Sequence, residues 1–210
     1  MKIIDLSLAV SEPGKDKFSF KRKEKIISSN GVTYTGIMYD FVMDSMDGTY
    51  LDLPGHIKET DDGYDMQNYP LEKLYRLKTA VIHLNRPNGS GAVTDKDLMA
   101  AFPHFPQGCG AMIINALGRK NFNEIEARSV YLSTDAVKWI IDSGIHILIS
   151  DIYESKAIHG VFLELFSAGV SAVCCPVNLH LIKAPFCQTS IFAIPAKSIT
   201  QIPCRIIAEL

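Results

Sequence analysis

The chain has 210 residues, of which 21 are Lys or Arg and 23 are Asp or Glu, so its formal net charge is −2. This balance provides no broad basic field for phosphate backbones or anionic lipid, which argues against nucleic acid and membrane surfaces as partners. At this length a single core can bury roughly 70% of the surface of the unfolded chain, so one stable domain is feasible.

The first residues do not predict a secretion signal. Asp5 interrupts the first apolar stretch, and no long apolar core or small-residue cleavage site follows it. The longest weakly polar stretch, Val170–Ile182, is too short to cross a bilayer and contains Pro176, Asn178 and His180. The five cysteines form an odd set without a CxxC pair, which is typical of a reducing compartment. We therefore expect a cytoplasmic protein.

Apolar runs of strand length recur along the chain and predict a sheet. They lie at Ile3–Leu8, Ile37–Met43, Ala80–Leu84, Ala111–Ile114, His146–Ile149, Ser171–Cys175, Ser190–Ile194 and Arg205–Ala208. In the second run, apolar side chains occupy alternate positions, Ile37, Tyr39, Phe41 and Met43, and therefore share one face. This pattern predicts a strand with one side buried.

Helices are expected at three places. Thr94 and Ser133 are N-cap residue types followed by an acid in the first turn, and they predict the starts of two helices. A third helix is expected over Ser155–Ser167. No repeat, low-complexity tract or change of composition divides the chain, so we expect a single domain over residues 1–210.

The segment 44–65 is rich in acids and turn formers. Gly48 and Pro54 fix an irregular backbone after a strand, where functional groups are often mounted. Asp52 and His56 are spaced so that the carboxylate can orient the imidazole, as in a general base with its orienting group. The alternative from composition alone is a surface loop whose acids confer solubility.

This segment resembles the signature of the cyclase family, the metal-dependent hydrolases that include bacterial kynurenine formamidases (arylformamidases). The family signature reads His-x-Gly-Thr-His-x-Asp-x-Pro-x-His. The chain reads Met46-x-Gly48-Thr49-Tyr50-x-Asp52-x-Pro54-x-His56. It therefore retains the turn residues, the aspartate and the last histidine, but it replaces the first two histidines by Met46 and Tyr50.

The resemblance covers most of the chain, because Ile3–Ser7, Tyr131–Ala136, Gly144–Asp151 and Pro203–Ala208 are similar to further family segments. It implies an α/β fold: a single domain with a mixed, partly barrel-like β-sheet and a few flanking helices. It also implies a homodimer or homotetramer that hydrolyses an amide or cyclic amide, such as an N-formylkynurenine-type substrate. In this chemistry a metal-bound water with a pKa of about 7 attacks the carbonyl, and His56 is the acid/base group.

Two residues depart from the family's metal-binding pattern. Met46 offers a thioether, which suits Cu(I) rather than Zn²⁺ or Mn²⁺. Tyr50 offers a phenol whose ordinary pKa is about 10, so it ionises near neutral pH only at a large cost. We therefore expect metal-dependent activity to be lost or strongly altered, with Met46 and Tyr50 lining a pocket for a small molecule.

Further along the chain, the resemblance places Phe162 and Cys174 where the family has a histidine on a helix and a glutamate on the next strand. His159 precedes Phe162 by three residues, about one helical turn. Because cysteinate is a good zinc ligand, a rebuilt site for one zinc or manganese ion could use Asp52, His159 and Cys174, with or without His56. The alternative is that side chains fill the cavity and no metal binds.

The residues leave two functions open. The first is an arylformamidase-like hydrolase that retains slow, metal-free activity, with His56 as the base, Asp52 orienting it and the Tyr50 hydroxyl donating to the oxyanion. The second is a non-catalytic small-molecule binder that uses the same pocket. Arg119 lies in a stretch that borders the pocket in the family and is a candidate substrate contact.

Overall fold

The computed structural model describes residues 2–10, 18–103 and 106–210. Its main sheet has the strand order β1-β12-β11-β5-β7-β9-β10-β4, and an additional pairing between β12 and β4 closes seven of these strands into a barrel. The strands are β1 (Ile3–Asp5), β4 (Tyr50–Asp52), β5 (Leu77–His83), β7 (Ala111–Asn115), β9 (Ile147–Ser150), β10 (Ser171–Cys174), β11 (Phe186–Ala193) and β12 (Gln201–Glu209). The expected α/β fold with a mixed, barrel-like sheet is confirmed.

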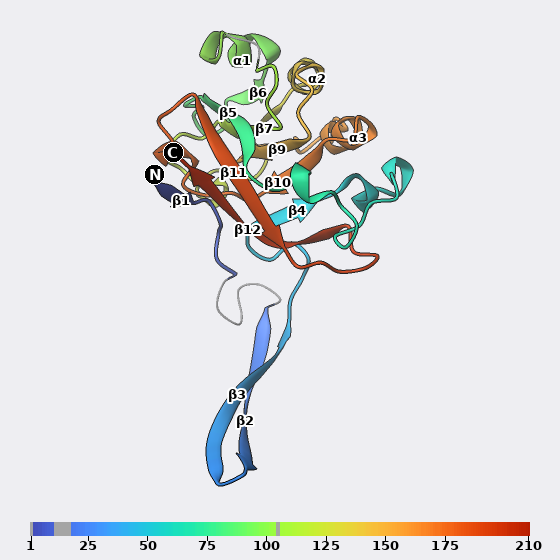
Figure 1. Cartoon of the computed structure of the whole chain (residues 1–210). Coiled ribbons are helices and arrows are strands. Elements are labelled where there is room, and N and C mark those ends of the chain that lie inside the picture. The colour runs from blue at the N-terminus through green and yellow to red at the C-terminus, as the bar shows by residue number, and fades with distance from the viewer. Residues whose placement is uncertain (1, 11–17, 104–105) are drawn as a thin grey trace.

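Strands β5, β7, β9 and β10 are parallel neighbours, whereas the other pairings of this sheet are antiparallel. Parallel strands require crossover connections, and each crossover here contains one helix. Helices α1 (Asp95–Ala101), α2 (Thr134–Asp142) and α3 (Val161–Ser167) lie side by side over the parallel strands (Figure 1). Strands β6 (Gly91–Val93) and β8 (Val130–Leu132) form a small parallel pair beside them. Within the described residues, no helix is long and apolar enough to span a bilayer.

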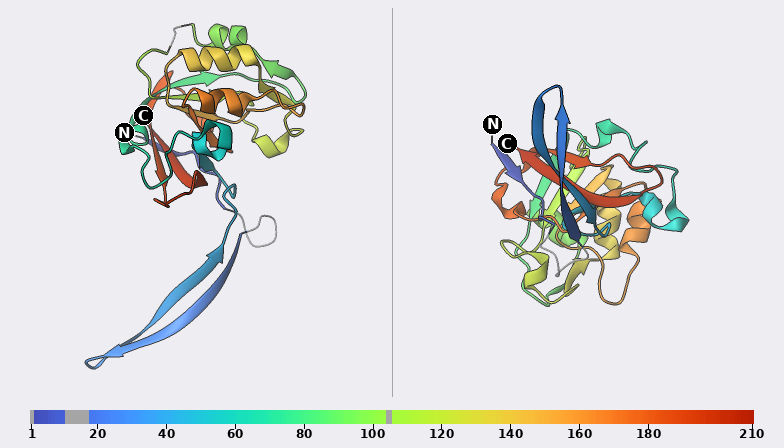
Figure 2. Two further views of the ribbon diagram at one scale, coloured as in Figure 1. Left: turned by 90° about the vertical axis from the view of Figure 1, so that its right-hand side faces the viewer. Right: turned by 90° about the horizontal axis from the view of Figure 1, so that it is seen from below.

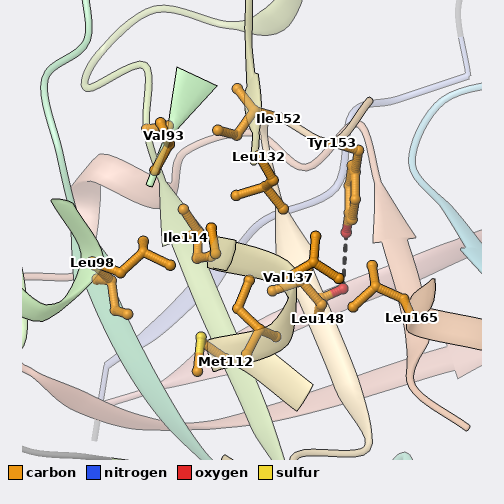
Figure 3. Packing of buried hydrophobic residues seen from close by; sticks show 14 of the residues in the cluster. Val93, Leu98, Met112, Ile114, Leu132, Val137, Leu148, Ile152, Tyr153 and Leu165 are labelled. Carbon is orange, nitrogen blue, oxygen red and sulfur yellow. Dashed lines mark hydrogen bonds between the residues drawn. The ribbon is translucent and has the colours of Figure 1, made fainter. Parts of the chain in front are cut away.

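The side chains of the parallel strands alternate between two apolar cores. Met112, Ile114 and Leu148 pack under the helices, as Figure 3 shows. Their neighbours Ile113 and Ile147 belong to the second core, which fills the barrel interior. Because both faces of these strands are buried, their sequences are continuous apolar runs instead of alternating patterns. These runs are the reason that the strands could be predicted.

All eight predicted strand regions overlap a strand of the structure, and the two predicted helix starts are confirmed. The hydroxyls of Thr94 and Ser133 accept hydrogen bonds from the backbone N–H groups of Asp97 and Ala136, respectively.

The third helix starts later than predicted, at Val161 instead of Ser155. The buried carboxylate of Glu154 accepts hydrogen bonds from the backbone N–H groups of His159, Gly160 and Val161. These bonds fix the residues before Val161 as a loop, which the pattern of apolar residues did not reveal.

Strands β2 (Ser19–Ser29) and β3 (Val32–Val42) form an antiparallel hairpin that projects away from the barrel as an arm (Figures 1 and 2). Asn30 and Gly31 join the strands with φ values of 51° and 80°, as a two-residue type I′ turn requires. The prediction that one side of the strand around residues 37–43 is buried is wrong, because every residue of β3 except Gly36 is exposed within this chain.

The loop before β4 is fixed by Gly48 and Thr49. The Thr49 hydroxyl donates a hydrogen bond to the Cys175 carbonyl oxygen (2.7 Å) and accepts one from the Leu8 backbone N–H (2.7 Å). Gly48 has a φ of +71°, and a Cβ atom there would lie 2.8 Å from the Leu8 carbonyl oxygen. The loop therefore has no space for a side chain at this position.

We predict that Gly48→Ala lowers the free energy of unfolding by more than about 2 kcal/mol, because a left-handed backbone and a backbone clash act together. The matched control is Gly63→Ala. Gly63 has a φ of +81°, and a Cβ atom at this position would meet no other atom within 4 Å, so this substitution should cost only about 1 kcal/mol. Equilibrium unfolding in urea measures the free energy of unfolding of both variants. Equal losses of stability would contradict the conclusion that the loop has no space for a side chain at Gly48.

Candidate functional site

Strand β4 brings Tyr50 and Asp52 next to Cys174. The strand pairs with β10, with Tyr50 opposite Cys174 and Asp52 opposite Ala172. Because side chains alternate along a strand, Tyr50 and Asp52 share the face that lies under the helices, and Leu51 points into the barrel. The Cys174 thiol donates to Asp52 Oδ2 at 3.7 Å. Thus three of the residues predicted for the site lie together.

Burial disfavours the charged forms of these three groups. Burial, followed by the nearby Cys174, Cys175 and Asp52, raises the pKa of Tyr50 above its ordinary value. Burial and the adjacent Asp52 carboxyl likewise raise the pKa of the Cys174 thiol. Burial also raises the pKa of Asp52 to about 6, although Gln201, His56 and Cys174 partly oppose this increase. Within the described part of the chain, Asp52 Oδ1 is buried and has no hydrogen-bond partner, which further disfavours a charge on this carboxylate.

A cavity of about 280 Å³ opens beside Tyr50 and Cys174. Its walls are largely aromatic or aliphatic and include Phe122, Ile125, Tyr153 and Phe162. The Tyr153 and Phe162 rings stack, with centroids 5.0 Å apart and an interplanar angle of 23°. The Tyr153 hydroxyl is fixed by hydrogen bonds to the carbonyl oxygens of Leu148 (2.9 Å, Figure 3) and Val173 (2.8 Å). This wall is therefore rigid and apolar.

Polar groups border the same cavity. Asp151 lines it and accepts hydrogen bonds from the backbone N–H groups of Ala116 (2.8 Å) and Leu117 (3.0 Å). Burial raises the pKa of Asp151 to about 7. Arg128, an exposed residue, lines another part of the cavity. The sequence reasoning missed Tyr153 and Arg128, because neither belongs to a recognisable motif.

The remaining predicted site residues do not line this cavity. His56 Nε2 lies 3.2 Å from the side-chain amide nitrogen of Gln201, which can donate to it. The Met46 side chain is 53% exposed. His159 precedes α3 instead of lying on it, and its ring packs against Tyr131 at 5.2 Å between centroids. Arg119 lies in a separate hollow near His180. The roles assigned to these residues stay predictions.

The donor set does not fit a divalent metal ion. In the ranges 2–10, 18–103 and 106–210, no group of three or more His, Cys, Asp or Glu side chains is arranged to hold one. Asp52 and Cys174 are close together, but the third neighbour, Tyr50, is a phenol whose raised pKa opposes ionisation. Zinc ligands must be deprotonated, and burial favours the protonated form of all three groups.

Comparison with known proteins places this site in a defined family. Residues 4–155 match the model of a family described as "Putative cyclase". Among solved structures, a "predicted metal-dependent hydrolase" from Bacillus stearothermophilus is 20% identical, with a TM-score of 0.65 over 99% of this chain and 97% of that chain. Isatin hydrolase A from Labrenzia aggregata is 16% identical, with a TM-score of 0.70 over 99% and 93% of the two chains.

A third structure, described as a novel cyclase, is 12% identical and has a TM-score of 0.73 over 100% of this chain and 88% of that chain. The search of curated proteins gave no match. At these identities the structural likeness shows the shared fold. The family model, in contrast, matches most of the sequence, including strand β4 and the loop that precedes it. The chain therefore belongs to the cyclase family that this model describes.

Proposed function

We propose that this protein binds a small aromatic molecule in the cavity beside Tyr50 and does not hydrolyse it. The observation that supports this function is that Tyr50 and Cys174, whose pKa values are raised by burial, lie beside Asp52 where the family resemblance expects a histidine and a glutamate as metal ligands. A pocket that is mostly apolar, with a few convergent polar groups, is typical of small-molecule sites. In this proposal the fold binds the ligand, and no metal-bound hydroxide attacks it.

The cavity favours a ligand with one or two rings and a polar edge. A volume of about 280 Å³ is just below the usual range for ligand pockets, about 300–1,000 Å³, and therefore suits a small ligand. The stacked Tyr153 and Phe162 rings offer an aromatic wall, and Arg128 offers a cation to a carboxylate or carbonyl group. Aromatic amides and carboxylates combine these features. A structural relative, isatin hydrolase A from Labrenzia aggregata, was solved with benzyl benzoate, another aromatic carbonyl compound.

Hydrolysis is disfavoured because the predicted base, His56, and its orienting carboxylate, Asp52, do not line the cavity. Gln201 occupies the space beside the His56 ring. Amide cleavage without a metal requires a base within hydrogen-bond reach of the attacking water. Two carboxylates do line the cavity, those of Asp151 and Glu154, but each already accepts hydrogen bonds from backbone N–H groups.

The ligand class can be tested by thermal shift with benzamide, benzoate and formanilide. At least one should raise the melting temperature, because a ligand at about 100 times its dissociation constant stabilises the native state by about 2.7 kcal/mol. Phe162→Ala should weaken binding at least about tenfold by removing an aromatic wall. Phe192→Ala, at an exposed aromatic residue outside the cavity, is the matched control and should bind normally. No shift with any of the three compounds, or hydrolysis of formanilide, would contradict the proposed function.

Metal analysis tests the donor set. Protein purified without chelators should contain far less than one zinc or manganese ion per chain. The fourfold variant Met46→His, Tyr50→His, Phe162→His and Cys174→Glu restores the metal ligands that the family resemblance implies. Its zinc affinity, measured by dye competition, should be at least about a hundredfold higher than that of the wild type. Stoichiometric metal in the wild type that disappears in Asp52→Ala would instead support a rebuilt metal site.

The raised pKa of Asp52 predicts a specific pH dependence of stability. The unfolded chain loses this proton near pH 4 and the folded chain near pH 6, so the stabilising contribution is complete below about pH 4 and is lost as the pH rises to about 6. Relative to Asp52→Asn, the wild-type free energy of unfolding should fall by about 3 kcal/mol across this window. Glu72→Gln, at an exposed position, should give a profile parallel to the wild type. Parallel profiles for Asp52→Asn and the wild type would refute a raised pKa of Asp52.

A further inference from the structure

A second hollow, of about 640 Å³, lies at the carboxyl ends of β5 and β7. His83 and Asn115 end these two parallel strands, pair with each other in the register and line the hollow. His180 and Lys183, which follow β10 in the chain, line it as well. Among the described residues, none lines both this hollow and the cavity beside Tyr50. Because α/β proteins commonly bind ligands at the carboxyl ends of parallel strands, this position is typical of a binding site.

Backbone hydrogen bonds fix the two loops that form the walls of this hollow. The Leu84 N–H donates to the Asn115 carbonyl oxygen (2.8 Å), and the Arg86 N–H donates to the Ala116 carbonyl oxygen (2.9 Å). These bonds extend the pairing of β5 and β7 beyond the ends of the strands. The Asp151 carboxylate accepts two further backbone N–H groups from the loop after β7. The loops are therefore held together without the help of a ligand.

The lining of the hollow is cationic. It includes four basic side chains and, among the described residues, no Asp or Glu; the four are Arg86, Arg119, Lys120 and Lys183. Arg86 is engaged, because it forms an ion pair with Asp97 (3.3 Å) and donates to two backbone carbonyl oxygens. In the part of the chain that the structure describes, no carboxylate pairs with the other three. Since the whole chain has a net charge of −2, these three uncompensated cations form a local positive region.

The imidazole of His180 responds to these charges. Burial, followed by the charges of Lys183 and Arg119, lowers the pKa of His180. The two cations come from different segments of the chain, and their shared effect on one ring shows that both lie near the same part of the hollow. A further positive charge is therefore disfavoured there, whereas an anion would offset the repulsion among the cations already present.

Apolar surface completes the lining. Three apolar residues contribute to it, namely Leu84, Pro87 and Leu117. Both ring nitrogens of His83 are occupied, because Nε2 lies 2.7 Å from the Ile182 carbonyl oxygen and Nδ1 lies 3.0 Å from the side-chain amide nitrogen of Asn115. The ring therefore adds no free polar group. The volume of about 640 Å³ is within the usual range for ligand pockets, about 300–1,000 Å³, and leaves room for a molecule with an apolar body and an anionic group.

We propose that this hollow binds an organic phosphate of nucleotide size. Three uncompensated cations favour a phosphate, with a charge of roughly −1.5 to −2 at pH 7, over a carboxylate, with a charge of −1. The Arg119 guanidinium can form two parallel hydrogen bonds to a phosphate, and Lys120 and Lys183 add point charges. The positive region is confined to one hollow, which suits a small molecule and not a nucleic acid backbone. This inference is independent of the ligand proposed for the cavity beside Tyr50.

Isothermal titration calorimetry of the full chain with AMP, ADP, adenosine and pyrophosphate tests the ligand class. Both nucleotides should bind, and ADP should bind more tightly than AMP because its second phosphate meets further cations. Adenosine lacks the phosphate and pyrophosphate lacks the apolar body, so each should bind at least about tenfold more weakly than ADP. Absence of binding by both nucleotides, or equal affinities for adenosine and AMP, would overturn the proposal. Equal affinities for pyrophosphate and ADP would overturn the assignment of an organic ligand.

Substitutions locate the bound nucleotide. Arg119→Gln and Lys183→Gln, both at exposed positions, should each raise the dissociation constant of ADP at least about tenfold, because each removes a charge-assisted hydrogen bond. Lys138→Gln, at an exposed lysine of α2 outside the hollow, is the matched control and should bind ADP normally. Phe162→Ala should also bind ADP normally, because Phe162 lines the cavity beside Tyr50 and not this hollow. An unchanged dissociation constant in Arg119→Gln and Lys183→Gln, or loss of ADP binding in Phe162→Ala, would place the nucleotide elsewhere and overturn the proposal.

Discussion

The pairing of β4 on both of its edges is the constraint on which the rest of the structure depends. This strand has only three residues, yet it pairs with β10 on one side and β12 on the other and so closes the barrel. Leu51 is completely buried inside the barrel, which fixes the register of the strand. With the register fixed, Tyr50 and Asp52 must both lie on the opposite face. The geometry of the site is thus a consequence of barrel closure.

Barrel closure also explains how the fold persists with a different set of polar groups. A cluster of charged ligands in this buried position would require a metal ion to offset its desolvation. In this chain burial raises the pKa values of Tyr50 and Cys174, so the phenol and the thiol remain neutral beside Asp52. These two neutral groups contact the neighbouring apolar core without a compensating cation.

The sequence predicted those parts of the structure that depend on local chemistry. Apolar runs identified the barrel strands, and Thr94 and Ser133 marked two helix starts. The arm was missed, although Asn30-Gly31 is the dipeptide that a type I′ hairpin turn favours, because apolar alternation was interpreted as burial. At the site, the family resemblance singled out Asp52 and Cys174, which contact each other. Tyr153 could not be predicted, since its position depends on hydrogen bonds to the backbone of two separate strands.

Gly48 and Thr49, which fix the loop before β4, show why parts of a sequence motif can be retained for structural reasons. Gly48 allows a left-handed turn against Leu8, and Thr49 forms hydrogen bonds with the backbone of Leu8 and Cys175. Both roles are structural and do not depend on a bound metal. Selection for folding alone is therefore enough to retain them, independently of any selection for catalysis. Within one short motif, the residues that shape the backbone and the residues that bind a metal can therefore change at different rates. A match at the backbone-shaping residues alone does not predict enzymatic activity.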